Sequence, residues 1–368
     1  MFDLLREARR PLFIWGAGIR PYATQALTLA RRWNVPVACT WGAIDLMHYD
    51  DPLMAGGFGT HGTRAANFAV QNADLVISVG SRLDTKATGS PVHFARGARL
   101  VMVDIDAAEV AKFGQLGRTI DVGVVSDAGD FLRDMEAMPY SYVGIWPAHI
   151  RAWRQRYDKP EVTWPGVNPY ELVREIARYT TKDDILCSDT GTALGYLMQG
   201  FPFKGERFLH AFNMTPMGYG LPAAVGASFA TGRRVILVTG DGSIMMSLPE
   251  LATVARWNLS IKIILLDNQG HAMCRQTQRQ WLGGKYPSTS VEGGLGFPLW
   301  SDVPGAFRIP YCDTLSDLMG MEGPAFIKVP IHPDAYLIPQ ARYGQPLEDA
   351  DPQLPREEFN RQMIVEPL

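Results

Sequence analysis

The sequence lacks the features of a disulfide-rich or zinc-binding protein. It has only four cysteines in 368 residues, and none of them forms a CxxC pair. Its seven histidines likewise show no HxxxH or other paired spacing. Because zinc and disulfide frameworks depend on such spacings, both are disfavoured. We expect the four cysteines to be reduced, structural thiols.

Long apolar runs and an excess of either charge are also missing. Apolar runs such as 235–238 and 261–266 are far shorter than the roughly 18 residues of a membrane span. The 35 Lys and Arg residues nearly balance 38 Asp and Glu residues, so a basic nucleic-acid-binding surface is not expected. No charged segment followed by an apolar one opens the chain, as a signal peptide would. We therefore expect a cytoplasmic protein that binds neither a membrane nor nucleic acid.

The pattern of hydrophobic residues predicts two doubly wound α/β domains with parallel sheets. Short strand-type runs alternate with helical stretches, which is typical of parallel α/β layers. In the first part of the chain strands are predicted at 12–15, 35–39, 74–79 and 100–103, with a helix at 21–33. In the second part strands are predicted at 185–187, 235–238, 261–266 and 325–329, with helices at 221–230 and 248–258. Ser247 and Glu250 form the pattern of a capping box for the last helix, and Pro249 fits its first turn.

Proline and charge divide the chain into four parts. Residues 1–135 form the first domain, and the proline-containing stretch 136–168, with an amphiphilic segment at 146–157, is predicted to be a linker over a surface. Residues 169–337 form the second domain. The proline- and charge-rich residues 338–368 are predicted to be a tail that wraps over a neighbouring surface.

Polar residues follow two neighbouring predicted strands of the second domain. Gly240-Asp241-Gly242-Ser243 comes just after the strand 235–238, and Asp267-Asn268 ends the next one. Carboxyl ends of parallel strands are where open α/β sheets bind ligands, and carboxylate and amide oxygens suit Mg²⁺ or Ca²⁺. The glycine and serine would let backbone N–H groups approach an anion held by that metal. Taken alone, the GDGS segment is also consistent with a simple polar turn.

Together these segments resemble the thiamine diphosphate motif, GDG followed by NN after an intervening helix. Residues 273–278 are similar to the GMVRQWQ stretch of acetolactate synthase large subunits, 217–224 to their MGYGLPAA, and 188–191 to their TDVG loop. Residues 59–64, 73–76, 80–84 and 104–106 resemble MHGTRYAN, ADLLI, GARFDD and DIDP of the family's central domain. The resemblance covers about residues 5–340 in order, and it implies a central domain followed by a diphosphate-binding domain.

The resemblance implies roles for individual residues. It assigns Mg²⁺ ligation to Asp241, Asn268 and the carbonyl of Gly270. It assigns thiamine diphosphate contacts to Thr190, Gly191, Thr192, Ala193, Thr215, Met217, Gly240, Gly242, Ser243 and Met273. Met217 aligns with the apolar residue that holds the cofactor in its folded V shape, in which the aminopyrimidine lies beside the thiazolium carbon so that proton transfer is nearly intramolecular. Alternatively, Met217 is simply a methionine of the hydrophobic core.

The chain departs from the family pattern at two positions of this site. Thr215 stands where the family has glycine, so a side chain would lie beside the cofactor ring, although the Thr215 carbonyl could still accept from the 4′-amino group. Thr277 stands where the synthases have tryptophan near the substrate. The family's substrate choice therefore does not carry over, and a bulkier or more polar acceptor than pyruvate becomes an option.

In the central domain the resemblance leaves two alternatives open, a retained FAD and a fold kept for assembly. FAD binding would use Gly16, Gly18, Gly59, His61, Gly80, Arg82 and Asp104. Against it, the family's triple glycine is here interrupted by Ala17, and its second arginine is Lys86, which lacks the bidentate fork.

The family's first domain, which binds the aminopyrimidine and carries the catalytic glutamate, has no counterpart in this sequence. We therefore expect no catalytic residue in this chain and a separate pyrimidine-domain subunit that supplies the glutamate, assembled as a 2:2 heterotetramer. The resemblance implies decarboxylation of a 2-oxo acid and transfer of the acyl carbanion, held by the cofactor, to an aldehyde or ketone. A non-ligating decarboxylase subunit and a non-catalytic cofactor-binding or regulatory subunit are the alternatives.

Overall fold

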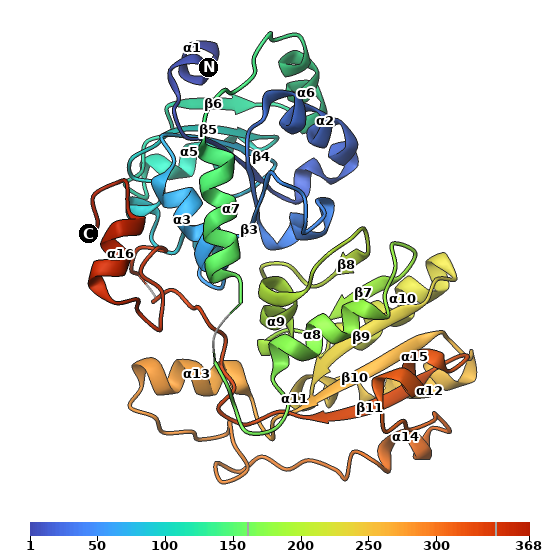
Figure 1. Ribbon diagram of the computed structural model, residues 1–368. Coiled ribbons are helices and arrows are strands. Elements are labelled where there is room, and N and C mark those ends of the chain that lie inside the picture. The colour runs from blue at the N-terminus through green and yellow to red at the C-terminus, as the bar shows by residue number, and fades with distance from the viewer. Residues whose placement is uncertain (160–161, 343) are drawn as a thin grey trace. The chain divides into compact units, whose positions relative to one another are not determined.

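The computed structural model describes residues 1–159, 162–342 and 344–368 and divides into two compact units. The first unit contains residues 1–160 and 338–368, and the second contains residues 161–337. Each is built on one parallel sheet with helices (Figure 1), which confirms the predicted α/β class. Both predicted sheets are therefore present, one in each unit.

The first unit has a six-stranded sheet in the order β3-β2-β1-β4-β5-β6. Its strands are β1 (Pro11–Trp15), β2 (Val37–Cys39), β3 (Met54–Gly57), β4 (Leu75–Val79), β5 (Arg99–Asp104) and β6 (Val122–Val125). The chain moves outward from β1 to β3 and then returns to β4 on the other side of β1. Because crossovers are right-handed, this reversal puts the helices of the two halves on opposite faces of the sheet.

The helices of the first unit are mostly short. They are α1 (Phe2–Glu7), η1 (Ala17–Tyr22), α2 (Ala23–Trp33), η2 (Trp41–Leu46), α3 (Arg64–Asn72), α4 (Thr85–Thr88), η3 (Pro91–His93), α5 (Ala107–Ala111), η4 (Lys112–Gly114), α6 (Ala128–Glu136), α7 (Trp146–Tyr157) and α16 (Arg356–Gln362). Helix α7, which falls in the predicted linker, packs against α3 and buries Trp146, Ile150 and Trp153.

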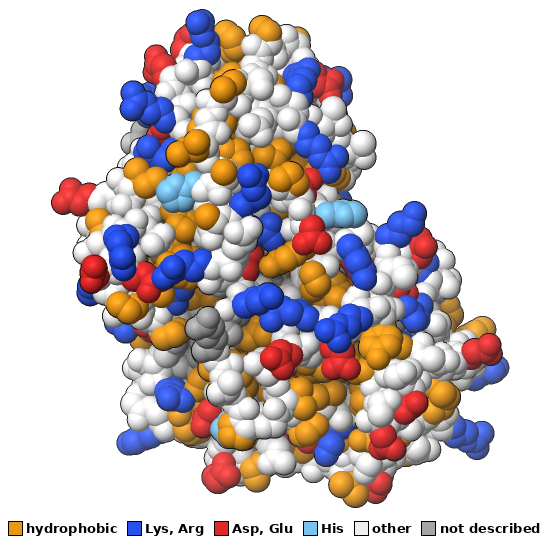
Figure 2. Space-filling model, viewed as in Figure 1, with side chains coloured by type: hydrophobic (Ala, Val, Ile, Leu, Met, Phe, Trp, Pro, Cys, Tyr) orange, Lys and Arg blue, Asp and Glu red, His pale blue; other side chains and the backbone are white. Residues whose placement is uncertain are grey.

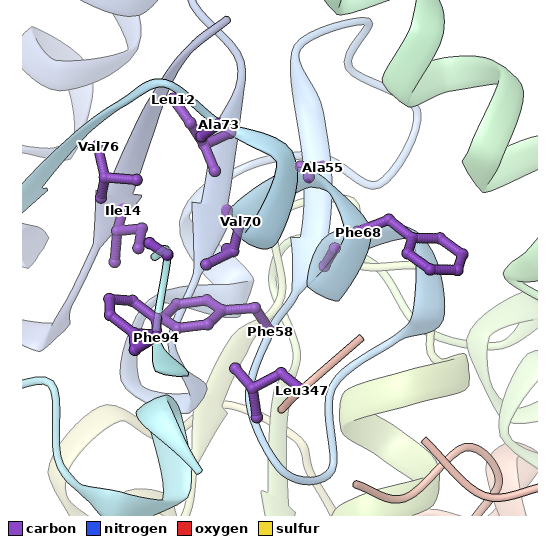
Figure 3. Close-up of a cluster of buried hydrophobic side chains, with 14 of the residues drawn as sticks. Leu12, Ile14, Ala55, Phe58, Phe68, Val70, Ala73, Val76, Phe94 and Leu347 are labelled. Carbon is purple, nitrogen blue, oxygen red and sulfur yellow. The ribbon is translucent and has the colours of Figure 1, made fainter. Parts of the chain in front are cut away.

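All nine residues of α3 are buried although several of them are polar, because the C-terminal residues 338–368 supply their partners. Arg64 donates to the carbonyls of Ala350 and Pro352, and Asn67 donates to the carbonyl of Leu347. Further along the helix, Gln71 bonds to Glu348 and Asn72 accepts from the backbone of Ile364 and Val365. Leu347 itself joins the core beside Phe58 and Phe94 (Figure 3).

The second unit has a five-stranded parallel sheet in the order β11-β10-β9-β7-β8. Its strands are β7 (Ile185–Ser188), β8 (Arg207–Leu209), β9 (Val235–Gly240), β10 (Ile261–Asp267) and β11 (Ala325–Pro330). Its helices are α8 (Pro169–Arg178), α9 (Thr192–Gly200), α10 (Gly220–Thr231), α11 (Asp241–Ile244), η5 (Leu248–Glu250), α12 (Leu251–Arg256), α13 (Ala272–Trp281), α14 (Val303–Ala306) and α15 (Leu315–Gly320). Apolar side chains on the central strands β9 and β10 are fully buried.

The structure corrects several local predictions. Strands β3, β6 and β8 were not predicted, because each is short and lies at or near a sheet edge, where a continuous apolar pattern is not required. The predicted capping box is wrong, since Ser247 makes no side-chain cap and its buried Oγ has no hydrogen-bond partner among the described residues. The segment starts as a 3₁₀ helix, in which the Glu250 N–H bonds to the Ser247 carbonyl instead, while Pro249 does lie in the first turn.

Candidate functional site

The sheet of the second unit has one point where the strand order reverses. The chain goes from β7 outward to β8, then returns across β7 to β9 and continues to β10 and β11. The loops after β7 and β9 therefore leave in opposite directions and open a crevice between them, the usual ligand site of such sheets. The two loops carry residues 189–193 and 240–243.

A cavity of about 210 Å³ lies at this crevice. It is lined by all of the residues to which the sequence assigned cofactor contacts or metal ligation, namely Thr190, Gly191, Thr192, Ala193, Thr215, Met217, Gly240, Asp241, Gly242, Ser243, Asn268, Gly270 and Met273. The structure thus brings together segments more than 80 positions apart in the chain. Their roles toward a ligand remain predictions.

Helix starts surround the cavity and supply backbone N–H groups. Gly191 precedes α9, and its φ of +82° lies in the region that favours glycine. Gly240 precedes the short helix α11, so Gly242 and Ser243 lie in its first turn. The unpaired N–H groups at a helix start attract anions, and the nine-residue α9 adds the positive end of its dipole.

Asp241 is the buried carboxylate of the cavity, with 1% of its surface exposed. Its oxygens accept hydrogen bonds from the N–H of Gly242 at 2.6 Å and of Gly270 at 3.2 Å. Burial raises the pKa of Asp241 to about 7, and the nearby Asp267 carboxylate adds to that rise, while the backbone hydrogen bonds oppose it. A cation beside Asp241 would relieve the cost of burying its charge.

Asn268 provides the clearest sign that the cavity suits a metal ion. It is 5% exposed, yet its Oδ1 accepts no hydrogen bond from any described residue. A buried carbonyl-type oxygen without a partner is costly, and a hard cation would satisfy it. The described residues contain no cluster of three or more His, Cys, Asp and Glu suited to a metal. The donor set here is different, one carboxylate with amide and backbone oxygens, and this set fits Mg²⁺.

Met217 and Thr215 form another part of the cavity wall. A Cβ added to Gly242 would lie 3.5 Å from Met217 Cε and 2.4 Å from His271 Nδ1, so a side chain at position 242 would collide. Thr215 has a φ of +40°, a left-handed conformation that is strained for a β-branched residue. Glycine, which the family has at this position, adopts a positive φ without this strain.

Sequence reasoning missed four residues that also line the cavity: Leu266, His271, Ala272 and Cys274. His271, Ala272 and Cys274 are neighbours of Gly270 and Met273 in the sequence. Their position at the start of α13 could therefore have identified them as cavity residues. The prediction that all four cysteines are structural thiols is wrong for Cys274. The other three cysteines are buried, whereas Cys274 is exposed.

In the first unit, the glycines assigned to FAD contact one another. A Cβ on Gly16 would lie 2.1 Å from the Gly80 carbonyl oxygen, and one on Gly18 would lie 2.9 Å from Gly80 Cα. The loops after β1 and β4 therefore meet backbone to backbone where the strand order of this sheet reverses. Close packing alone accounts for glycine at these three positions.

The other residues assigned to FAD are also engaged within the first unit. Gly59 exchanges two hydrogen bonds with the Asn67 side chain, and His61 contacts Gln340 at 3.2 Å. Arg82 forms an ion pair with Glu109 at 2.9 Å, and Asp104 accepts from the N–H of Asp106. The Arg82 side chain is 64% exposed, so its ion pair leaves part of the guanidinium accessible to solvent.

The crevice of the second unit has the features of a site for an anionic ligand held by a divalent cation. The family model described as "Thiamine pyrophosphate enzyme, central domain" matches residues 1–135, and "Thiamine pyrophosphate enzyme, C-terminal TPP binding domain" matches residues 189–304. The chain therefore belongs to the thiamine pyrophosphate enzymes and contains two of their domains.

Its curated relatives include acetolactate synthase large subunits. That of Parasynechococcus marenigrum (strain WH8102) is 32% identical over 80% of this chain and 48% of its own length. The isozyme 2 large subunit of Escherichia coli (strain K12) is 32% identical over 82% of this chain and 55% of its own length, and isozyme 1 is 28% identical over 93% and 62%. The chain thus spans about half to three fifths of the length of these relatives.

The surface is mixed in charge, with basic, acidic and apolar side chains interspersed over the visible face of each unit (Figure 2). This distribution agrees with the near balance of charges in the sequence. Among the described residues, no helix is both long and apolar enough to cross a membrane.

Proposed function

We propose that this chain binds thiamine diphosphate and Mg²⁺ in the cavity between the segments that follow β7 and β9 and acts as the large subunit of an acetolactate synthase-like carboligase. The observation that carries the proposal is the unpartnered Oδ1 of Asn268 beside the buried carboxylate of Asp241, in a cavity lined by helix starts. This arrangement supplies oxygen ligands for a cation and N–H donors for the diphosphate that the cation would bridge.

In this proposal the residues of the chain bind and orient the cofactor. Asp241, Asn268 and the Gly270 carbonyl hold Mg²⁺, and the N–H groups of 191–193, Gly242 and Ser243 hold the diphosphate. Met217 would contact the cofactor through its apolar side chain, and the Thr215 carbonyl would be available to accept a hydrogen bond from the cofactor's amino group. When bound, thiamine diphosphate supplies a carbon nucleophile and an electron sink for decarboxylation of a 2-oxo acid.

We further propose that the pyrimidine domain and its catalytic glutamate come from a partner polypeptide, and that the pair assembles as a 2:2 heterotetramer. The two family matches lie in the central and C-terminal domains, which supports a contribution from outside these residues. The region around the cavity also has an exposed apolar side chain, Met214, which is 84% exposed. Leu221, in the helix α10 that follows, is fully buried in the core.

The test is titration of the chain with thiamine diphosphate in the presence and absence of Mg²⁺, followed by assay with a pyrimidine-domain polypeptide. We expect Mg²⁺-dependent binding by the chain alone and 2-oxo acid turnover only in the mixture. An acyloin product supports the carboligase, whereas free aldehyde identifies a simple decarboxylase. Binding without turnover in the mixture would identify a non-catalytic subunit. Light scattering distinguishes the 2:2 complex from a 1:1 complex.

FAD binding in the first unit is a separate proposal that rests on sequence resemblance alone, and a central domain kept for assembly is its alternative. The contacts that Asp104 and His61 make within the chain support the alternative. The absorption spectrum of the purified chain after incubation with FAD and gel filtration decides between them. Retained flavin absorbance at a 1:1 ratio supports binding, and its loss supports the assembly role.

A further inference from the structure

Asp189 is a buried carboxylate that follows β7 directly and does not itself line the cavity. Only 1% of its surface is exposed. Its Oδ1 accepts from the N–H of Thr190 at 2.8 Å and of Gly218 at 3.1 Å, and its Oδ2 accepts from the N–H of Gly220 at 2.8 Å. The Ser243 hydroxyl also donates to this carboxylate.

These donors come from three segments that are separate in the chain and meet at the cavity. Thr190 belongs to the loop after β7, Gly218 and Gly220 follow Met217 in the chain, and Ser243 lies in α11 directly after β9. The Asp189 carboxylate therefore links these three segments of the chain and fixes their relative positions.

The chemistry of the four donors requires a group that only accepts hydrogen bonds. An ionised carboxylate meets this requirement, whereas an amide would place its own N–H₂ against at least one donor. Burial raises the pKa of Asp189, and the hydrogen bonds from Gly220, Thr190, Gly218 and Ser243 counteract the rise by favouring the charged form.

Two glycines make this close approach possible. A Cβ on Gly220 would lie 2.9 Å from the Asp189 nitrogen and 3.0 Å from its Oδ2, so a side chain there would push the carboxylate away. Gly218 has a φ of +85°, which favours glycine. The glycines around Tyr219 therefore serve the approach to Asp189.

We propose that Asp189 is a positioning residue that holds the N–H groups of the two anion-binding loops and the Met217 wall in their ligand-binding arrangement. The inference rests on the proposed function, because it assumes that the cavity takes the diphosphate end of the cofactor. In this proposal Asp189 touches no ligand itself. It acts through the groups that donate to it, on Thr190, Gly218, Gly220 and Ser243.

The experiment compares D189N with D184N in the full chain. Asp184 precedes the other end of the same strand, is 4% exposed, and pairs with Arg234 at 2.7 Å, so its substitution is a matched loss of a buried carboxylate. The probe is magnesium pyrophosphate, measured by calorimetry at a temperature where circular dichroism shows each variant folded. We expect D189N to weaken binding about 10- to 100-fold, and D184N to lower Tm while leaving affinity within about 3-fold.

Equal affinity of D189N and the unsubstituted chain would overturn the inference and leave the proposed function intact. Failure of the unsubstituted chain to bind either magnesium pyrophosphate or thiamine diphosphate would overturn the proposed function itself. If D189N does not fold, G220A replaces it, since the added methyl displaces the carboxylate but keeps its charge. Failure of both variants to fold would show that Asp189 serves folding rather than positioning, and would overturn the inference.

Discussion

The two sheets of this protein reverse their strand order in the same way, but the points of reversal differ in chemistry. In the first unit the loops after β1 and β4 pack backbone to backbone through Gly16, Gly18 and Gly80. In the second unit the loops after β7 and β9 leave a cavity, and a Cβ on Gly240 would meet nothing within 4 Å. Glycine after a parallel strand therefore indicates either a tight loop contact or a ligand site, and only the surrounding atoms decide which.

The two candidate sites also differ in the polar groups that the resemblance assigns to a ligand. The polar groups assigned to FAD in the first unit have partners within the chain, whereas Asn268 Oδ1 in the second unit has none among the described residues. A cation at this position would satisfy the Asn268 oxygen. The difference supports the proposal that the cavity of the second unit binds a metal-held ligand.

The largest expected effect is the loss of cofactor binding when a metal ligand is removed. Asp241→Ala and Asn268→Ala should each weaken Mg²⁺-dependent thiamine diphosphate binding at least about 100-fold, because each deletes an oxygen ligand of the cation that neutralises the diphosphate. Asp104→Ala, at the end of a strand in the first unit, is the matched control and should leave binding unchanged. Calorimetric titration measures all three, and unchanged affinity in both ligand variants would refute the site.

The next effect concerns stability and the packed loops of the first unit. Gly16→Ala should lower the free energy of unfolding by about 2–3 kcal/mol, because its methyl group collides with the Gly80 backbone. Gly240→Ala, with open space around the added methyl and a φ of −87°, should change it by less than about 1 kcal/mol. Denaturant unfolding gives both values. Equal destabilisation by the two substitutions would contradict the difference between the loops.

His61 should make the stability of the first unit depend on pH. Burial, with a smaller effect of the Lys86 charge, lowers the pKa of His61 to about 4. The folded protein therefore binds fewer protons than the unfolded chain between about pH 6.5 and 4, so stability is present above pH 6.5 and falls as the pH drops through this window. The loss attributable to His61 is at most about 3 kcal/mol. His61→Gln should show a correspondingly shallower decline of Tm between pH 7 and 4, and an identical decline would refute the assignment.

The smallest effect is expected at Thr215. Thr215→Gly relieves the strain of a φ of +40° but adds freedom to the unfolded chain, so the net gain in stability should be below about 1 kcal/mol. Thermal unfolding of the variant measures the change. A clear loss of stability would show that contacts of the threonine side chain outweigh the backbone strain.

The sequence predicted the parts of this structure that depend on local pattern. The buried strands β1, β4, β9 and β10 were predicted because continuous apolar runs are required there, and the motif spacing placed Asp241 and Asn268 at neighbouring strand ends. The role of Asp189 could not be predicted, because its donors at 218, 220 and 243 are brought to it only by the folded sheet. Strand β8 and the uncapped Ser247 were missed for a related reason, since sheet edges and helix type are decided by tertiary packing.

The path of the chain has a consequence for synthesis on the ribosome. Residues 161–337 form the second unit, while the first unit needs residues from both sides of that stretch. Its core includes Leu347 and Phe359, so residues translated after the second unit complete the first unit. The second unit can therefore finish folding before the first, the reverse of the usual N-to-C order in multidomain proteins. Until residues 338–368 have been translated, the polar side chains of α3 lack the partners that bury them.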